Sequence, residues 1–291
     1  MKIALCTALA LLAFAGNSIL CRLALGEGVI DAASFTSIRL LSGIIVLTVI
    51  LKMTPTSAIS GLKDSSKGSW KASFMLFLYA ITFSFAYISL ETGVGALILF
   101  GSVQMTMILV GLFSGNKLHY SEWLGVIVAF SGLVYLVLPD LTIPSFMGFI
   151  LMTVAGVAWG FYTLAGKSTK NPVSDTAYNF LRTLPLVLIL TVVTFQYAAL
   201  SQKGILLAVL SGGIASGVGY TIWYIALGGL STVQAAVLQL LVPMIAALGG
   251  VLFANEIFTL RLALSSLLVL GGIMAMILGR HYSELYANNI N

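Results

Sequence analysis

Two arginines stand at equivalent places in two long apolar runs. Arg39 lies in FTSIRLLSGIIVLT, and Arg182 lies 143 positions later in YNFLRTLPLVLILT. A guanidinium holds a carboxylate through charge-assisted hydrogen bonds, so each arginine could bind an anionic group or cap the end of a gated cavity. The alternative is an anchor whose side chain reaches the lipid headgroups. The residues alone leave both roles open.

Aromatic and amide side chains recur at helical spacing in other apolar runs. One run carries Tyr79 and Phe83 four residues apart, which places them on one helical face. Amides at such depth need partners, which neighbouring helices or a substrate supplies. Ligand pockets are mostly apolar with a few convergent polar groups. The predicted substrate-binding residues are Asn17, Tyr79, Phe83, Phe100, Gln104, Trp159, Tyr162, Tyr220, Trp223 and Gln239.

We expect the centre of this site between the third, fourth, eighth and ninth runs, with hydrogen bonds from Gln104 and Gln239. An anchor in the membrane interface, where Trp and Tyr are enriched, is the alternative role for several of the aromatic residues. The anchor role stays open for Tyr87, Tyr162 and Tyr224. Trp223 is either such an anchor or an apolar wall of the substrate pocket.

Nothing in the sequence suggests an enzyme. It contains no pairing of nucleophile and base, no metal-ligand cluster and no phosphate-binding glycine loop, so we expect no catalytic residue, no metal and no cofactor. Cys6 and Cys21 are separated by about 22 Å along one helix, too far for a disulfide. No Asp, Glu or His falls in the middle of an apolar run, so a dedicated proton relay is not evident.

Composition explains what must hold these residues. Of 291 residues, 59% are hydrophobic and only 8% are charged, and the mean hydropathy is +1.08. A soluble domain carries about 25% charged residues, so the solvent of this chain is lipid. The net charge of +5 is therefore attributed to cytoplasmic loops, and no nucleic-acid partner is expected.

Apolar runs long enough to cross a bilayer as helices occur throughout the chain. We count ten, and the predicted fold is an all-α integral membrane protein with ten transmembrane helices. The runs are Ile3 to Cys21, Phe35 to Leu51, Ser73 to Leu90, Val94 to Phe113, Ser121 to Leu138, Phe146 to Ala165, Phe180 to Leu200, Ile205 to Leu227, Thr232 to Phe253 and Leu260 to Gly279.

The first run could also be a cleaved leader, because it has a basic start and an apolar centre. Large residues precede Cys21, however, and the run has a counterpart in the second half, so we expect it in the mature protein. Basic residues concentrate in loops on one side, which predicts cytoplasmic N- and C-termini in the cell inner membrane. The inner residues are Lys2, Lys52, Lys63, Lys67, Lys71, Lys117, Lys167, Lys170 and Arg280, against Lys203 and Arg261 outside.

The two halves of the chain align with each other. Phe35 to Ile50 matches Tyr178 to Val193 without a gap, and the run from Val94 matches the run from Val233 at a constant offset of 139. We expect a first repeat at 1–139 and a second at 140–291. With five helices each, the repeats enter the membrane from opposite sides, which is typical of secondary transporters.

These features resemble the drug/metabolite transporter superfamily with paired EamA-type domains. The resemblance rests on Gly16, Asn17 and Arg22 in the first run, on Arg39, and on the block LVPMIAALGGVLFANE. It implies a ten-helix permease or exporter of small metabolites, including amino acids. The first half departs from the pattern, because Gln104 stands where the second half has Pro243, and Lys117 where it has Glu256.

The predicted function is alternating-access transport of a small, uncharged or zwitterionic, partly apolar metabolite such as an amino acid. Pro243 removes a backbone hydrogen bond and is expected to act as a hinge, with Arg39 and Arg182 as further gating residues. The alternatives are a channel and a non-transporting membrane scaffold. The substrate, the direction of transport, the coupling ion and a homodimer are left open by the residues.

Overall fold

The computed structural model describes residues 2–53, 67–113, 120–137, 143–166, 169, 171–230, 235 and 238–290. Every regular element in these ranges is a helix. Several loop residues used to predict the orientation, such as Lys63 and Lys117, lie outside the described residues, as does the start of the ninth run.

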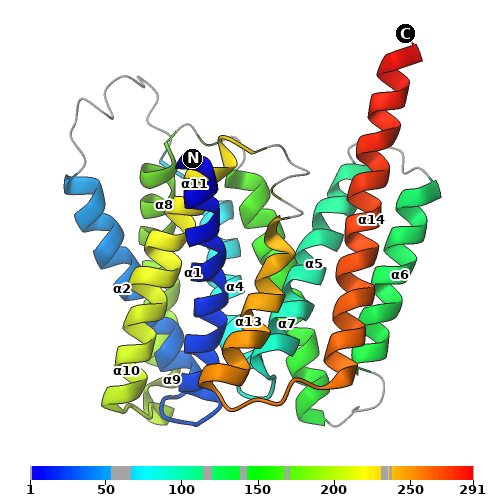
Figure 1. Ribbon diagram of the computed structural model, residues 1–291. Coiled ribbons are helices and arrows are strands. Elements are labelled where there is room, and N and C mark those ends of the chain that lie inside the picture. The colour runs from blue at the N-terminus through cyan, green and yellow to red at the C-terminus, as the bar shows by residue number, and fades with distance from the viewer. Residues whose placement is uncertain are drawn as a thin grey trace.

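The chain passes up and down through one bundle (Figure 1). The first half contains α1 (Lys2–Leu25), α2 (Ala32–Met53), α4 (Trp70–Ala86), α5 (Thr92–Phe113) and α6 (Tyr120–Val137). The second half contains α7 (Ile143–Gly166), α8 (Pro172–Leu181), α9 (Leu184–Thr194), a 3₁₀ turn η2 (Phe195–Tyr197), α10 (Gln202–Val209), a π-helical stretch η3 (Leu210–Val218), α11 (Gly219–Leu227), α13 (Leu241–Phe253) and α14 (Leu260–Ile290).

Length and composition confirm that the chain is suited to a membrane. Six helical stretches are long and apolar enough to cross a bilayer, and shorter apolar helices accompany them within the described residues. Each of the ten predicted runs overlaps one of these stretches. The six are Lys2–Leu25, Ala32–Met53, Thr92–Gly111, Phe146–Gly166, Pro172–Tyr197 and Gln202–Leu227, and the shorter ones are Trp70–Ala86, Trp123–Gly132, Leu241–Phe253 and Leu260–Ala275.

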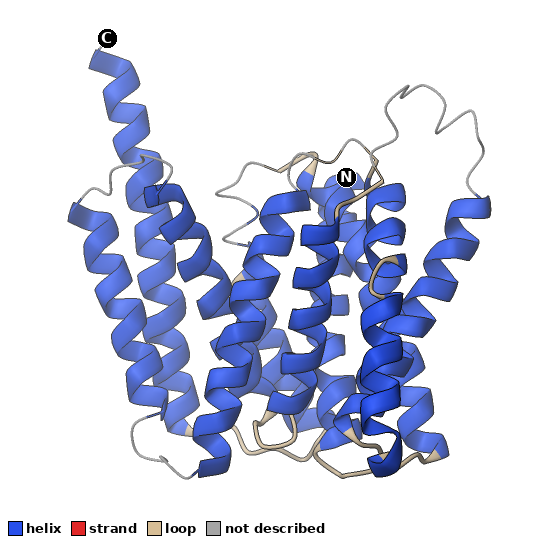
Figure 2. Cartoon of the chain, turned by 180° about the vertical axis from the view of Figure 1, so that it is seen from behind, coloured by secondary structure: helices blue, strands red, loops and turns tan. Residues whose placement is uncertain are grey.

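Helix α1 lies inside the bundle, in contact with α11, α13, α10 and α5. On one flank α2 packs against η3, α9 and α8, and on the other α14 packs against α6. The start of α1 and the end of α14 lie at the same end of the bundle, called the upper end below (Figure 1). Seen from behind, the helices still run roughly parallel to one axis (Figure 2).

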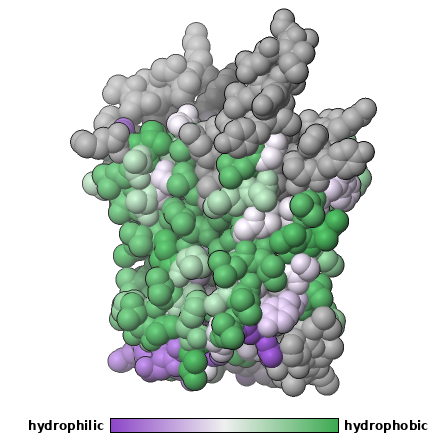
Figure 3. Space-filling model, turned by 45° about the vertical axis from the view of Figure 1, so that its right-hand side comes forward, coloured by the Kyte–Doolittle hydropathy of each residue, from purple (hydrophilic) through white to green (hydrophobic). Residues whose placement is uncertain are grey.

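Polarity is distributed as lipid requires. Large apolar side chains such as Leu188, Val192 and Leu267 are exposed, whereas Asn17, Arg39 and Gln104 are buried. The face drawn in Figure 3 is apolar over most of its described surface, with hydrophilic residues at its lower rim. Because hydrocarbon gives no advantage to burying apolar side chains, the interior is free to hold the polar groups.

The predicted start of the seventh run at Phe180 was wrong. The helix starts at Pro172, in the first turn of α8. The preceding residue, Asn171, caps the helix, because its side chain accepts a hydrogen bond from the Ser174 N–H. Proline suits this position because its missing N–H has no intrahelical partner there. The chain then breaks before α9, where Pro185 cannot donate to the preceding turn.

Close packing of α2 against η3 depends on a glycine. A Cβ on Gly212 would collide with the carbonyl oxygen of Arg39 and the hydroxyl of Ser42. Helical backbones approach this closely only at small residues. The π-helical stretch, a feature frequent at functional sites, brings Ser211 and Ser216 to face α1 and α2, since their hydroxyls bond Asn17 and Arg39.

Candidate functional site

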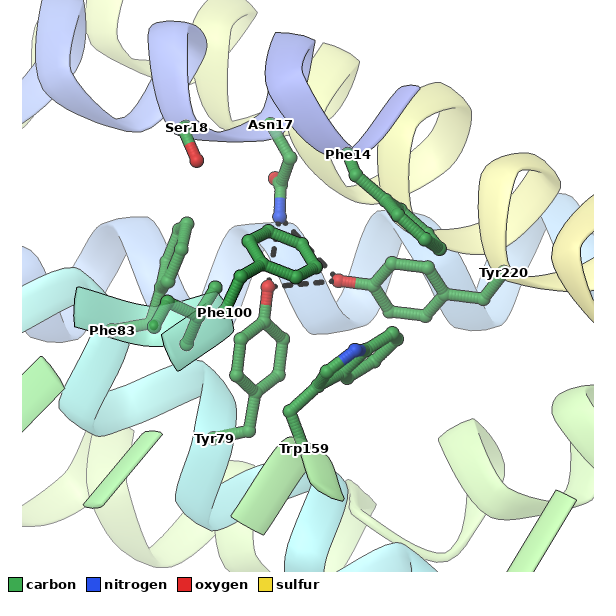
Figure 4. Close-up of a pocket in the computed structure, with 9 residues that line it drawn as sticks. Phe14, Asn17, Ser18, Tyr79, Phe83, Phe100, Trp159 and Tyr220 are labelled. Carbon is green, nitrogen blue, oxygen red and sulfur yellow. Dashed lines mark hydrogen bonds between the residues drawn. The ribbon is translucent and has the colours of Figure 1, made fainter. Parts of the chain in front are cut away.

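Four helices contribute to one buried polar cluster, which we define as Asn17, Arg39, Tyr79 and Tyr220. The Asn17 amide nitrogen donates to the hydroxyls of Tyr79 at 3.1 Å and Tyr220 at 3.4 Å. The two hydroxyls are 3.2 Å apart and hydrogen-bonded (Figure 4). Ser211 donates to the Asn17 amide oxygen at 2.5 Å, which fixes the amide orientation.

Arg39 is wholly buried beside these hydroxyls. Its Nη2 donates to Tyr220 at 2.8 Å and to Tyr79 at 3.1 Å, and its Nε donates to Ser216 at 3.1 Å. The guanidinium also lies over the rings of Tyr79 and Phe83, at 5.1 and 4.9 Å from their centroids. The anchor in the lipid headgroups, one of two roles that the sequence left open, is therefore wrong for Arg39.

A small cavity adjoins the cluster and has a volume of about 10 Å³, enough for about one water molecule. Ring contacts close its walls, including Phe14 against Tyr220 at 5.9 Å and Trp159 against Tyr220 at 4.6 Å. Figure 4 shows these rings converging on the polar atoms. The residues that line the cavity are Phe14, Asn17, Ser18, Tyr79, Phe83, Leu99, Phe100, Trp159 and Tyr220.

Six of the ten predicted substrate-binding residues line this cavity. They are Asn17, Tyr79, Phe83, Phe100, Trp159 and Tyr220. The cavity is not centred where the sequence predicts the site, since α1 and α7 contribute walls and α13 contributes none.

The other four predicted residues are buried outside the cavity lining. Trp223 packs behind the wall against Phe14, with centroids 5.6 Å apart. Tyr162 stacks on Tyr224 at 5.7 Å. Gln239 donates its amide nitrogen to the Ala235 carbonyl within its own helical turn, while its buried amide oxygen has no hydrogen-bond partner among the described residues. Gln104 is also buried.

Tyr87, Tyr162 and Tyr224 are buried as well. Tyr87 donates its hydroxyl to the Thr92 carbonyl, and Tyr224 donates to the Tyr162 carbonyl. An anchor in the membrane interface is therefore the wrong role for all three.

Three lining residues stand outside the ten predicted ones: Ser18, which is next to Asn17, and Phe14 and Leu99, which sequence reasoning missed. Phe14 precedes Asn17 by three positions, so both lie on one face of α1. That spacing was the available signal for Phe14. Leu99 stands in a continuous apolar run with nothing to distinguish it from lipid-facing neighbours.

Arg182 does not repeat the surroundings of Arg39. It is half-buried at the junction of α8 and α9 and donates to the Lys67 carbonyl. Its guanidinium lies 5.8 Å from the Trp70 ring centroid and 6.0 Å from that of Tyr178. The two arginines therefore occupy different settings, one inside the bundle and one near its upper end.

A charged contact ties helices together at the lower end of the bundle. Arg22, in the last turn of α1, lies 3.2 Å from the Glu256 carboxylate. The same carboxylate accepts from the Thr92 N–H at 2.8 Å and from its hydroxyl at 2.9 Å. We call these three residues the lower latch. Burial, with help from the neighbouring charge of Glu256, raises the pKa of Glu91 above its ordinary value, although Arg22 opposes the shift.

Two further carboxylates bridge the halves of the chain. Asp31 accepts from the N–H groups of Ser34 and Ala199, both at 2.9 Å. Burial works to raise the pKa of Asp31, but these hydrogen bonds prevail and hold it below its ordinary value. Asp175 accepts from the Gly68 N–H at 2.9 Å.

The helical bundle, its apolar exterior and its enclosed polar cluster define a multi-pass membrane protein with a polar interior. Residues 146–278 match the EamA-like transporter family. An uncharacterized protein of Pseudomonas aeruginosa is 44% identical over 95% of this chain and 94% of its own length. The chain belongs to the EamA-like transporter family and is a membrane transporter.

Other relatives are more distant. An uncharacterized transporter of Archaeoglobus fulgidus is 27% identical over 74% of this chain and 78% of its own. A protein of Escherichia coli K12 named "Probable amino-acid metabolite efflux pump" is 24% identical over 72% and 78% respectively. One crystal structure covers 93% of this chain and 97% of its own with a TM-score of 0.61; at 15% identity it supports the fold alone.

Proposed function

We propose that the chain is a secondary transporter that moves a small, partly apolar metabolite, such as an amino acid, by alternating access across the inner membrane. One observation carries the proposal: a polar cluster of four helices is sealed inside an apolar bundle around a cavity of about 10 Å³. Small-molecule pockets measure about 300–1,000 Å³. A metabolite enters only after the helices separate, so the present conformation corresponds to a closed state.

Contacts between the halves support the inverted repeat within this proposal. Asp31, just before α2, holds the backbone of Ala199, which lies between η2 and α10. Asp175, in α8, holds the backbone of Gly68 just before α4. In the aligned halves, α8 corresponds to α2 and α10 to α4. The two contacts lie at opposite ends of the bundle (Figure 1), as a two-fold axis in the membrane plane requires.

The two ends of the bundle offer gates for alternating access. The lower latch joins α1, α5 and the segment after α13. At the upper end, Asp175 and Arg182 hold the segment before α4. We propose that opening of one end accompanies closure of the other, and that Pro243, in the first turn of α13, permits the chain to bend where that helix begins.

We further propose that the upper end is cytoplasmic and that transport runs outward. The Lys and Arg distribution supports the orientation, and the printed name of the Escherichia coli relative supports export. A reporter active only in the cytoplasm, fused after Asn291, is expected to be active. Activity of the same reporter inserted near Asp140, and not at Asn291, would reverse the orientation.

Counterflow into liposomes tests the function. Purified protein is reconstituted, vesicles are loaded with one unlabelled compound of a metabolite panel, and uptake of the labelled compound is followed. A carrier gives saturable uptake that the internal compound accelerates. A channel gives uptake that the internal compound does not stimulate, and a scaffold gives none, so either result contradicts alternating access.

A further inference from the structure

The polar cluster contains more hydrogen-bond donors than acceptors. Three donors converge on the Tyr79 hydroxyl oxygen: the Asn17 amide, the Arg39 Nη2 and the Tyr220 hydroxyl. The Tyr220 oxygen receives the same two nitrogens. One phenolic proton of the tyrosine pair thus has no acceptor within the described cluster.

Three buried nitrogens in and behind the cavity wall have no hydrogen-bond partner among the described residues. They are Nη1 of Arg39, Nε1 of Trp159 and, behind Phe14, Nε1 of Trp223. Trp159 lines the cavity, and Arg39 lies directly behind the cavity walls Tyr79 and Phe83. Buried polar groups are normally paired, so each unpaired nitrogen marks a donor that the closed protein leaves unused.

The charge of Arg39, like the unpaired hydrogen-bond donors, indicates that the closed cluster lacks an anion. Arg39 keeps its positive charge at every physiological pH, yet no carboxylate lies among the described residues that line the cavity or bond to the cluster. The faces of Tyr79 and Phe83 compensate part of that charge. An unpaired buried charge is costly, and an anion at the cluster would supply both the missing charge and the missing acceptors.

The other residues that line the cavity indicate the chemistry of the rest of such a ligand. Phe14, Phe83, Leu99 and Phe100 offer apolar surface, and none of the described lining residues is acidic. The site therefore has apolar contacts for a side chain but no carboxylate for an ammonium group.

We propose that Arg39, Tyr79 and Trp159 receive the carboxylate of the transported molecule, and that the substrate class is apolar organic monocarboxylates, whose α-ammonium group is not required. This inference rests on the proposed transport function and narrows its substrate. The carboxylate takes hydrogen bonds from the Arg39 guanidinium, from the free phenolic proton and from the Trp159 indole after the helices part.

Three matched probes test the inference: 3-phenylpropionate, phenylalanine and phenylalaninamide. Binding to the purified chain is measured by thermal stabilisation, and transport is measured by uptake into liposomes. The two carboxylates bind, and the amide binds at least tenfold more weakly. Arg39→Gln and Tyr79→Phe each weaken the carboxylates, by about tenfold to hundredfold for the charged group, and reduce the ratio of acid to amide affinity.

Controls separate recognition from folding. Arg39→Lys keeps the charge and retains part of the acid preference. Lys203→Gln removes an equal charge from the exposed pair with Glu27 and leaves the ratio unchanged. A purely structural Arg39 would shift the unfolding temperature without changing the acid-to-amide ratio, and that result would overturn the inference.

The inference also fails if the wild-type chain binds the amide as tightly as the acids, or binds neither carboxylate. Failure of the transport function looks different, because then no compound of a wider panel of neutral, cationic and anionic metabolites shows counterflow. A chain that exchanges amines or neutral compounds alone would remain a transporter and would lose the carboxylate site.

Discussion

Breaking the lower latch should open the lower end of the bundle. In Glu256→Gln the carboxylate that pairs with Arg22 at 3.2 Å and accepts from Thr92 at 2.8 and 2.9 Å becomes a neutral amide. A hydrogen bond to a charged group contributes about 1.5–3 kcal/mol. Arg22 is partly exposed, and the amide of the variant keeps one carbonyl oxygen as an acceptor. We therefore expect the closed state to lose about 2 kcal/mol of stability relative to the open state, which makes the open population roughly 30-fold larger.

A natural thiol reports this opening. Cys21 is buried beside Arg22 in the last turns of α1, so a water-soluble maleimide reaches it only when the lower end opens. In a Cys6→Ser background, Glu256→Gln should increase the labelling rate of Cys21 by roughly 30-fold. Labelling is followed by mass spectrometry on monodisperse protein.

The matched control is Glu27→Gln, which removes a carboxylate from an exposed ion pair with Lys203 at the same end. That variant should leave Cys21 labelling unchanged. Equal labelling of Glu256→Gln and its parent, with the same amount of folded protein, would refute the view that the latch holds this end closed. Acceleration in both variants would indicate a general effect of charge.

Three other changes have defined outcomes. Asp31→Asn should lower the free energy of unfolding by about 1–3 kcal/mol at neutral pH. Because the pKa of Asp31 is depressed in the folded state, this difference is fully present above the unfolded pKa of about 3.9 and vanishes as the pH falls through the lower folded pKa. A pH-independent difference in thermal unfolding would contradict the prediction. Pro243→Ala should lower the turnover number in counterflow by about tenfold with little change in half-saturation, because the proline stands just after the turn at Leu240 and alanine would allow one continuous, stiffer helix across it; an unchanged rate with altered affinity would exclude the hinge. Trp223→Ala removes a fully buried side chain behind the cavity wall and should lower stability by about 3–5 kcal/mol without changing selectivity among substrates of graded size, whereas a shift in selectivity would make Trp223 a wall residue.

Much of the site was predictable because its side chains are unusual where they stand. Asn17, Tyr79 and Tyr220 carry hydroxyl or amide groups in apolar runs, and such groups turn inward to find partners. Each of the three lines the cavity. Gln239 is also buried but lies outside the cavity lining, where a backbone carbonyl one turn away accepts from its amide nitrogen. The polar chemistry of a side chain in an apolar run predicts that it faces the interior of the bundle. Which residues it contacts there depends on the neighbouring helices.

The sequence by itself determined the helices and their solvent, since a long apolar run has few other ways to satisfy its backbone in lipid. Only the tertiary structure decided which face of each helix is internal. Leu99 lines the cavity and Leu188 faces outward, although lipid and protein interior are equally apolar to leucine. Arg39 and Arg182 align in sequence, yet α2 turns the first toward two tyrosine hydroxyls, while a break before α9 leaves the second near the upper end. Their surroundings differ because burial and partners come from packing between distant segments.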